Sequence, residues 1–150
     1  MKFSGTKNVL LPIAFEDLGS GKDRIHPNIK LLEEVNLKEK LSINKKFSPR
    51  VIWRFFNPMI PDIAGDYEGI NGVIKLFEVL DIITRGSFEY IPVRTITVGN
   101  ELVMMHVKNR MNTYANQIEI DTILVWRIVN KKIVEVWNIP SVYNDQNPSL

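Results

Sequence analysis

The sequence predicts an α+β fold in which helices cover one face of a curved antiparallel sheet. Two observations lead to this prediction. Apolar residues repeat at helical spacing in the first part of the chain, and from Ser87 onward their period changes to two. Because the helical segments come first and a meander of strands follows, the two kinds of element form separate layers.

Residues 28–47 carry the first helical spacing, with one apolar stripe before Asn36 and another after it. Asparagine suits a helix cap, so we expect two short helices with Asn36 at the break. Pro49 then ends helical structure. Residues 51–56 predict a strand, because they are rich in aromatic and β-branched side chains.

Pro58 and Pro61 force a loop after this strand, and the next helical pattern follows. Apolar residues at spacings of three and four predict an amphipathic helix that ends at Gly86. They are Val73, Leu76, Phe77, Leu80 and Ile83.

Four strands follow the last helix, at residues 88–98, 101–111, 115–129 and 132–139. Pro92 indicates that the first of them starts late or lies at a sheet edge. The turn signals between them are Gly99-Asn100, the Asn112-Thr113 region and Asn130-Lys131.

A two-residue turn at Asn130-Lys131 predicts that Trp126 lies opposite Glu135 and Leu124 opposite Trp137. These residues then share an almost wholly apolar face, on which Glu135 is the single carboxylate.

A two-residue turn at Asn112-Thr113 predicts Met105 opposite Ile120 and His106 opposite Glu119. His106 then lies on a second face, where charged residues mix with valine and isoleucine. A slip of one residue would exchange the two faces.

The composition excludes several classes of protein. The chain has 150 residues, 45% of them apolar and 24% charged, with net charge +2, two histidines and no cysteine. This length fits one domain. The absence of cysteine excludes disulfides, thiolate metal sites and cysteine nucleophiles. The charge is too small to indicate a nucleic-acid partner, and no apolar run approaches the roughly 20 residues that span a membrane.

We expect an N-terminal arm at residues 1–24, a domain at residues 25–146 and a tail at residues 147–150. We also expect a cytoplasmic protein that needs no cofactor and no metal.

Three segments, taken in order and spacing, resemble the SnoaL-like polyketide cyclase family, within the nuclear transport factor 2-like superfamily that includes ketosteroid isomerases. They are residues 51–58 (VIWRFFNP), 64–77 (AGDYEGINGVIKLF) and 124–137 (LVWRIVNKKIVEVW). The resemblance covers about residues 27–146. It implies a cone-shaped barrel, with a strongly curved sheet wrapped around N-terminal helices and a pocket at the open end. It also implies a homodimer joined through the outer sheet face.

Glu135 is the first candidate catalytic residue. On an apolar face beside Trp126 it would be desolvated, which would raise its pKa toward the range of a general base. Tyr67 could supply a hydroxyl group to a ligand carbonyl. The competing interpretation is a structural glutamate, hydrogen-bonded to the backbone or to a tyrosine.

Six residues are candidates for the walls of an apolar pocket, with plain core packing as the alternative. They are Trp53, Phe77, Thr122, Leu124, Trp126 and Trp137.

His106 and Asp121 are an alternative catalytic pair. The expected register puts both on the outer face near Glu119 and Lys108, which favours an ion pair at the surface or at a subunit interface.

Two functions stay open, beside a third interpretation in which the outer sheet face is the functional surface of a protein-interaction module or plain homodimer. One is a cofactor-independent isomerase, cyclase or hydrolase that acts on a small apolar carbonyl or epoxide compound by carboxylate acid–base chemistry. The other is a non-catalytic binder of a small hydrophobic ligand, which the apolar or uncharged residues Thr122 and Leu124 favour, because relatives often carry a histidine or carboxylate there. Either function is compatible with a homodimer.

Overall fold

A computed structural model describes residues 25–114 and 116–142 of the chain. The predicted arm at residues 1–24 and tail at residues 147–150 lie outside the described residues. In chain order the elements are α1 (Pro27–Glu33), α2 (Lys40–Lys46), β1 (Phe47–Phe55), the 3-10 turn η2 (Pro61–Ile63), β2 (Gly65–Glu68), α3 (Gly69–Ile83), β3 (Glu89–Val98), β4 (Leu102–Asn112), β5 (Gln117–Val129) and β6 (Lys132–Pro140).

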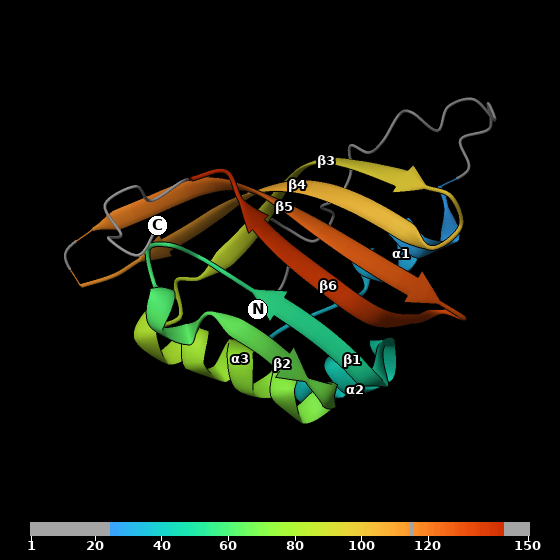
Figure 1. The fold of residues 1–150 in the computed structure, drawn as a ribbon, viewed down its shortest axis with the longest axis horizontal. Coiled ribbons are helices and arrows are strands. Elements are labelled where there is room, and N and C mark those ends of the chain that lie inside the picture. The colour runs from blue at the N-terminus through green and yellow to red at the C-terminus, as the bar shows by residue number, and fades with distance from the viewer. Residues whose placement is uncertain (1–24, 115, 143–150) are drawn as a thin grey trace.

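The predicted α+β class is confirmed, with helices preceding a long meander (Figure 1). The strands form one six-stranded sheet in the order β2-β1-β6-β5-β4-β3. The predicted all-antiparallel sheet is wrong, because β1 runs parallel to β6.

The expected cone-shaped barrel is wrong as well, because the sheet is neither closed nor strongly curled. Its edges are β2 and β3, which do not pair with each other. Closure requires two edges that can continue the ladder. Here β2 has only four residues, and the register of β3 shifts between Pro92 and Arg94. Short strands and proline are typical of edges that stay open.

The first two helices are separate, as predicted. The Asn36 side chain accepts a hydrogen bond from the Lys38 backbone N–H at 3.0 Å, while the Asn36 N–H donates to Ser42 Oγ at 2.8 Å. These bonds fix the break between α1 and α2. The third helix, α3, buries Val73, Leu76, Phe77 and Leu80 of its predicted apolar stripe against β1. It ends at Ile83, which is exposed, and not at Gly86 as predicted. We call the sheet face that α3 covers the inner face, and the opposite one the outer face.

The β5–β6 connection is a two-residue turn, as predicted, and Asn130 and Lys131 adopt φ values of 51° and 65°. The strands then pair Ile128 with Ile133 but Arg127 with Glu135, so Val134 is an extra residue in β6. This β-bulge exchanges the faces of the rest of the strand.

The pairs predicted beyond this turn are therefore wrong. Trp126 lies opposite Val136 and Leu124 lies opposite Asn138. The sequence pattern gave no sign of the bulge, because Val134 suits either face.

The β4–β5 connection is longer than predicted. Asn112 pairs with Gln117, and the Thr113 N–H donates to the Asn116 carbonyl at 2.8 Å. Met105 consequently lies opposite Leu124 and not Ile120. This shift is an even number of residues, so the predicted faces of β4 and β5 are retained.

No helix within residues 25–114 and 116–142 is long and apolar enough to cross a membrane.

Lys131 holds a left-handed backbone conformation that costs an ordinary L-residue about 1–2 kcal/mol. We expect Lys131→Gly to raise the free energy of unfolding by about 0.5–1 kcal/mol, since glycine adopts this φ freely but is more flexible when unfolded. Urea denaturation measures the change. Lys131→Ala is the control: it removes the same charge and keeps the strained φ, so an equal gain for alanine would contradict the argument.

Candidate functional site

The inner face of the sheet carries most of the predicted pocket walls, and they form a packed core. Trp53 makes edge-to-face contacts with Phe77, with ring centroids 4.9 Å apart, and with Trp126, at 5.4 Å. Leu124 and Thr122 lie on the same face and are buried. The core-packing interpretation therefore describes these five residues.

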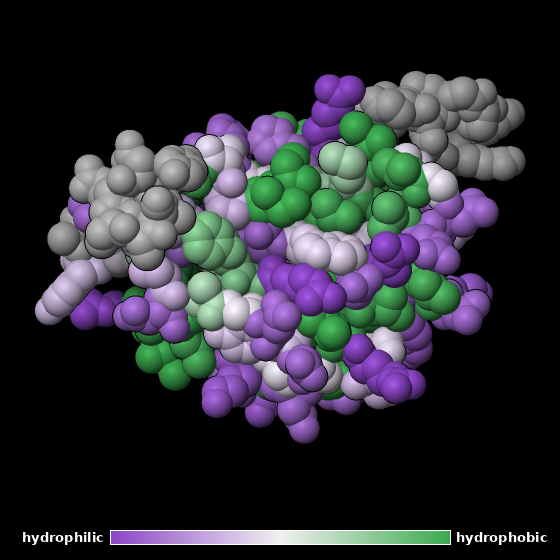
Figure 2. Space-filling view, in the orientation of Figure 1, coloured by the Kyte–Doolittle hydropathy of each residue, from purple (hydrophilic) through white to green (hydrophobic). Residues whose placement is uncertain are grey.

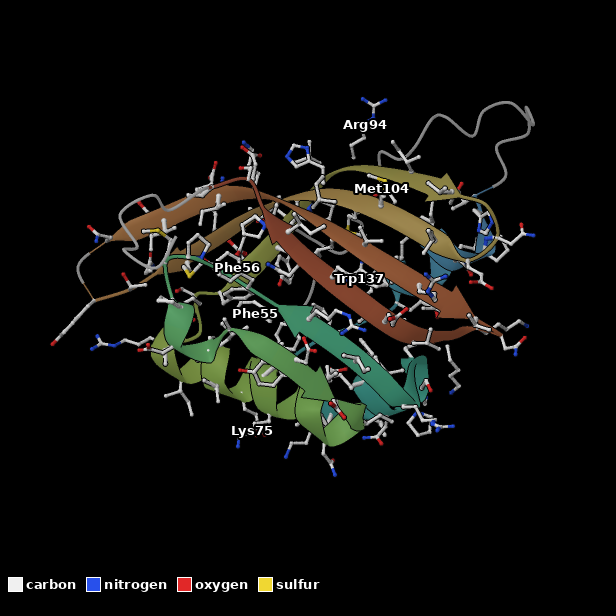
Figure 3. All side chains as sticks on the ribbon, viewed as in Figure 1. Phe55, Phe56, Lys75, Arg94, Met104 and Trp137 are labelled. Carbon is white, nitrogen blue, oxygen red and sulfur yellow. The ribbon has the colours of Figure 1, made fainter. Side chains whose placement is uncertain are left out.

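Trp137 is not part of this group, because the bulge at Val134 turns it to the outer face (Figure 3). The guanidinium carbons of Arg54 and Arg127 lie 5.6 Å and 5.9 Å from its ring centroid. The indole thus packs between two cations, an arrangement favourable to the ring's negative face.

Glu135 also lies on the outer face, so the expected desolvated carboxylate on the apolar face is wrong. Its oxygens accept a hydrogen bond from Arg127 Nε at 2.8 Å and one from Arg54 Nη2 at 3.1 Å. Desolvation raises the pKa of Glu135, but the hydrogen bonds and charges of Arg127 and Arg54 outweigh it, so the pKa is lowered overall. A carboxylate held ionised by two guanidiniums is a poor proton acceptor at neutral pH.

Tyr67 faces the helix side of the sheet from β2, opposite Trp53. Its hydroxyl donates a hydrogen bond to the Ile63 carbonyl at 2.6 Å, and burial raises its pKa. The hydroxyl therefore holds the loop before β2, and the structure does not bring Tyr67 and Glu135 together.

His106 and Asp121 lie on the outer face, where the predicted register puts them. His106 Nε2 is 2.7 Å from Asp121 Oδ1, and Lys108 Nζ is 3.0 Å from the same oxygen. The hydrogen bond from His106, followed by that from Lys108, lowers the pKa of Asp121 against a smaller effect of desolvation. Asp121 therefore pairs with Lys108 and shares a hydrogen bond with His106 at the surface, where the sequence favoured them.

Four buried polar side chains form a cluster that sequence reasoning missed. Tyr90 donates its hydroxyl to Asn138 Oδ1 at 2.8 Å, although β4 and β5 separate their strands in the sheet. Asn138 Nδ2 donates to the Phe56 carbonyl at 2.8 Å, and the next residue, Asn57, donates to Asn109 Oδ1 at 3.3 Å.

Burial raises the pKa of the Tyr90 hydroxyl far above its usual range. The cluster therefore stays neutral and joins β3, β4 and β6 to the loop after β1. The sequence held a sign that Asn109 is buried, because Asn109 continues the alternate positions of β4 whose side chains face inward.

The described residues form a cavity at another place, where α3 ends. It has a volume of about 730 Å³ and lies between the end of α3, the loop after β1 and the β4–β5 connection. Its lining residues are Met59, Ile60, Ile82, Ile83, Thr84, Arg85, Ser87, Asn112, Thr113 and Tyr114. In Figure 2 hydrophobic side chains gather at the lower left, over this end of the molecule. None of the predicted pocket residues lines it.

Hydrogen bonds hold the walls of this cavity in place. Ser87 Oγ donates to the Thr84 carbonyl at 2.6 Å and accepts from the Asn112 N–H at 2.7 Å. On the opposite wall, the Met59 N–H donates to Asn57 Oδ1 at 2.9 Å. The buried asparagine cluster therefore adjoins the cavity and supports its rim.

No protein-family model matches the sequence, and no curated protein sequence matches it. Solved structures do resemble this one. An NTF2-like protein of unknown function from Burkholderia pseudomallei is 18% identical, with a TM-score of 0.64 over 76% of this chain and 90% of the other. A protein described as a SnoaL-like polyketide cyclase from Jannaschia sp. CCS1 is 13% identical, with a TM-score of 0.62 over 81% and 92%. TerC, co-crystallised with polyporic acid, is 16% identical, with a TM-score of 0.65 over 77% and 92%.

This chain has the SnoaL-like, NTF2-like fold. At these identities the likeness concerns the fold, and the chemistry has to be argued from the side chains. In this SnoaL-like fold the buried polar side chains of the described residues are asparagine and threonine, together with Tyr90. Within the same residues, no three histidine, aspartate or glutamate side chains lie close enough together to hold a metal ion.

Because Glu135 pairs with two guanidiniums, its contribution to the free energy of unfolding should depend on pH. Its pKa in the folded protein lies below the ordinary value of 4.5. The stability that ionised Glu135 contributes is therefore fully present above about pH 4.5, its ordinary pKa, and is lost as the pH falls through the lower pKa of the folded protein. We expect Glu135→Gln to lower the free energy of unfolding at pH 7 by about 1 kcal/mol, and the variant to lose less stability than wild type between about pH 5 and about pH 2.

Urea denaturation across this pH range tests the prediction. Glu101→Gln is the matched control, because Glu101 contacts Arg127 from a more exposed position, where solvent screens the pair. We expect a smaller change for the control. Parallel pH curves for wild type and Glu135→Gln would contradict the assignment.

Proposed function

We propose that this protein is a non-catalytic binder of a small, largely apolar molecule, which occupies the cavity at the end of α3. The observation that carries the proposal is the cavity itself. Its volume of about 730 Å³ falls within the usual 300–1,000 Å³ of small-molecule sites. Four of its lining residues, Met59, Ile60, Ile82 and Ile83, are large and apolar.

The exposure of these apolar side chains supports the proposal. Ile82 is 74% exposed, and Met59 and Ile83 are also exposed. Contiguous exposed apolar side chains around a hollow are typical of binding sites. TerC, which has a similar fold, was co-crystallised with the small molecule polyporic acid.

The acid–base enzyme is the weaker candidate, because its two proposed groups are engaged elsewhere. Glu135 pairs with Arg54 and Arg127, and the Tyr67 hydroxyl donates to the Ile63 carbonyl. Neither residue lines the cavity. Among residues 25–114 and 116–142, the buried polar groups of the inner face include no carboxylate and no imidazole to accept a proton.

A neutral apolar probe tests the proposed function. We expect 1-octanol to shift the backbone amide resonances of Ser87 and Asn112, and Ile82→Gln to weaken binding by about fivefold, because one apolar wall is lost. Ile82 is exposed, so this change does not disturb the core.

Leu41→Gln is the control, since Leu41 is 69% exposed on α2 and does not line the cavity. If octanol shifts other regions of the protein, or if both variants weaken binding equally, the proposed site is wrong.

We propose further that the outer face joins two copies of this chain. Ile96, Met104, Val125 and Trp137 lie opposite one another on successive strands and form an apolar row across the face. Figure 3 labels Met104 and Trp137 on this face, and Figure 2 shows hydrophobic side chains over β3 to β5. To one side of the row, farther along β4 and β5, lie both acids and bases, Glu119 and Asp121 with Lys108 and Arg110. A face with both signs of charge can complement a copy of itself across a two-fold axis.

Sedimentation tests this partner. Met104 is 38% exposed in the middle of the row. We expect a dimer for the wild-type protein at micromolar concentration and a monomer for Met104→Glu, because the carboxylate would be buried at the interface without a partner. Leu41→Glu places the same charge on α2 and should remain a dimer. A wild-type monomer would contradict the proposal.

A further inference from the structure

We infer that the cavity at the end of α3 takes apolar carboxylic acids and that Arg85 binds their carboxylate. This inference rests on the proposed function and names the class of ligand. The apolar residues described above would contact the body of such a molecule, while one positive charge at the wall would contact its acidic end.

Among the described residues that line the cavity, Arg85 is the only charged one, and none of them is an acid. In the part of the chain that the structure describes, its guanidinium lies over the ring of Tyr114, 6.0 Å from the centroid, and pairs with no carboxylate. Most other guanidiniums in the fold behave differently: Arg54, Arg110 and Arg127 each contact an acid. Five N–H donors of Arg85 are therefore available to an anion.

The other polar groups of the wall are less available. Thr84 Oγ1 donates to the Leu80 carbonyl at 2.7 Å and accepts from the Phe88 N–H. Ser87 Oγ donates to the Thr84 carbonyl and accepts from Asn112. Both hydroxyls are used to hold the end of α3. A ligand with a polar end would therefore find its strongest partner in Arg85.

The backbone at Arg85 adds a separate observation. Arg85 has a φ of 54° and precedes Gly86, whose φ is 78°. The Gly86 N–H donates to the Asp81 carbonyl at 2.8 Å and closes the helix. Two left-handed residues in succession turn the chain sharply, and only the second is a glycine. This left-handed arginine places its side chain at the end of α3, beside the cavity, at a conformational cost that glycine would not have.

A matched pair of probes tests the inference: octanoate carries a carboxylate and 1-octanol does not. By calorimetric titration we expect wild type to bind octanoate about tenfold more tightly than octanol, since a charge-assisted hydrogen bond is partly screened at an exposed site. Arg85→Gln should remove this advantage and leave octanol binding unchanged. High salt should weaken octanoate binding alone.

Lys75→Gln is the control for net charge. Lys75 lies on α3, is exposed at the lower edge of the molecule in Figure 3, and does not line the cavity. It should keep the octanoate advantage. Arg85→Gly removes the guanidinium and relieves the left-handed strain, so it secures a folded variant and should show the same loss as Arg85→Gln.

The outcomes separate the two proposals. If octanol binds and Ile82→Gln weakens it, but octanoate has no advantage, the proposed function stands and the carboxylate class is wrong. Equal losses for Arg85→Gln and Lys75→Gln would show a general charge effect and overturn the role of Arg85. A stability change without a change in octanoate affinity would make Arg85 only a cation at the helix C-terminus. If neither probe binds, the proposed function and this inference are both wrong.

Discussion

The β-bulge at Val134 decides which chemistry lies on each side of this sheet. One extra residue in β6 turns Glu135 and Trp137 outward to Arg54 and Arg127 and turns Asn138 inward to Tyr90. Without it, a carboxylate would face the aromatic core, where an unpaired charge is costly. With it, the charged groups stay half-exposed and the interior is apolar or neutral.

The close packing of the interior explains where the cavity lies. Trp53, Trp126 and Phe77 fill the region between the sheet and α3, and the Tyr90–Asn138 bond ties β3 to β6. Such contacts make a close-packed core. The cavity lies instead at the end of α3, where the helix stops, three segments meet and Ile82 is exposed.

Much of the fold could be predicted from the residues in sequence. The period of two predicted the faces of the β4 and β5 residues correctly, because an even shift in register leaves the faces unchanged. The His106–Asp121 pair followed from the same alternation. The candidate site was predicted less well, because Glu135 and Trp137 lie beyond the bulge, which exchanges their faces. The cavity joins residues 59–60, 82–87 and 112–114, and no local pattern relates segments so far apart.

The sequence by itself determined the class of fold, the division into two short helices and a long one, and the alternation along each strand. Those features depend on neighbouring residues, on caps such as Asn36 and on turns such as Asn130-Lys131. Tertiary structure alone decided that β1 lies parallel to β6, that the sheet stays open and that Arg85 stands over a cavity. These features depend on contacts between distant segments, whose free energy comes from packing rather than from local propensity.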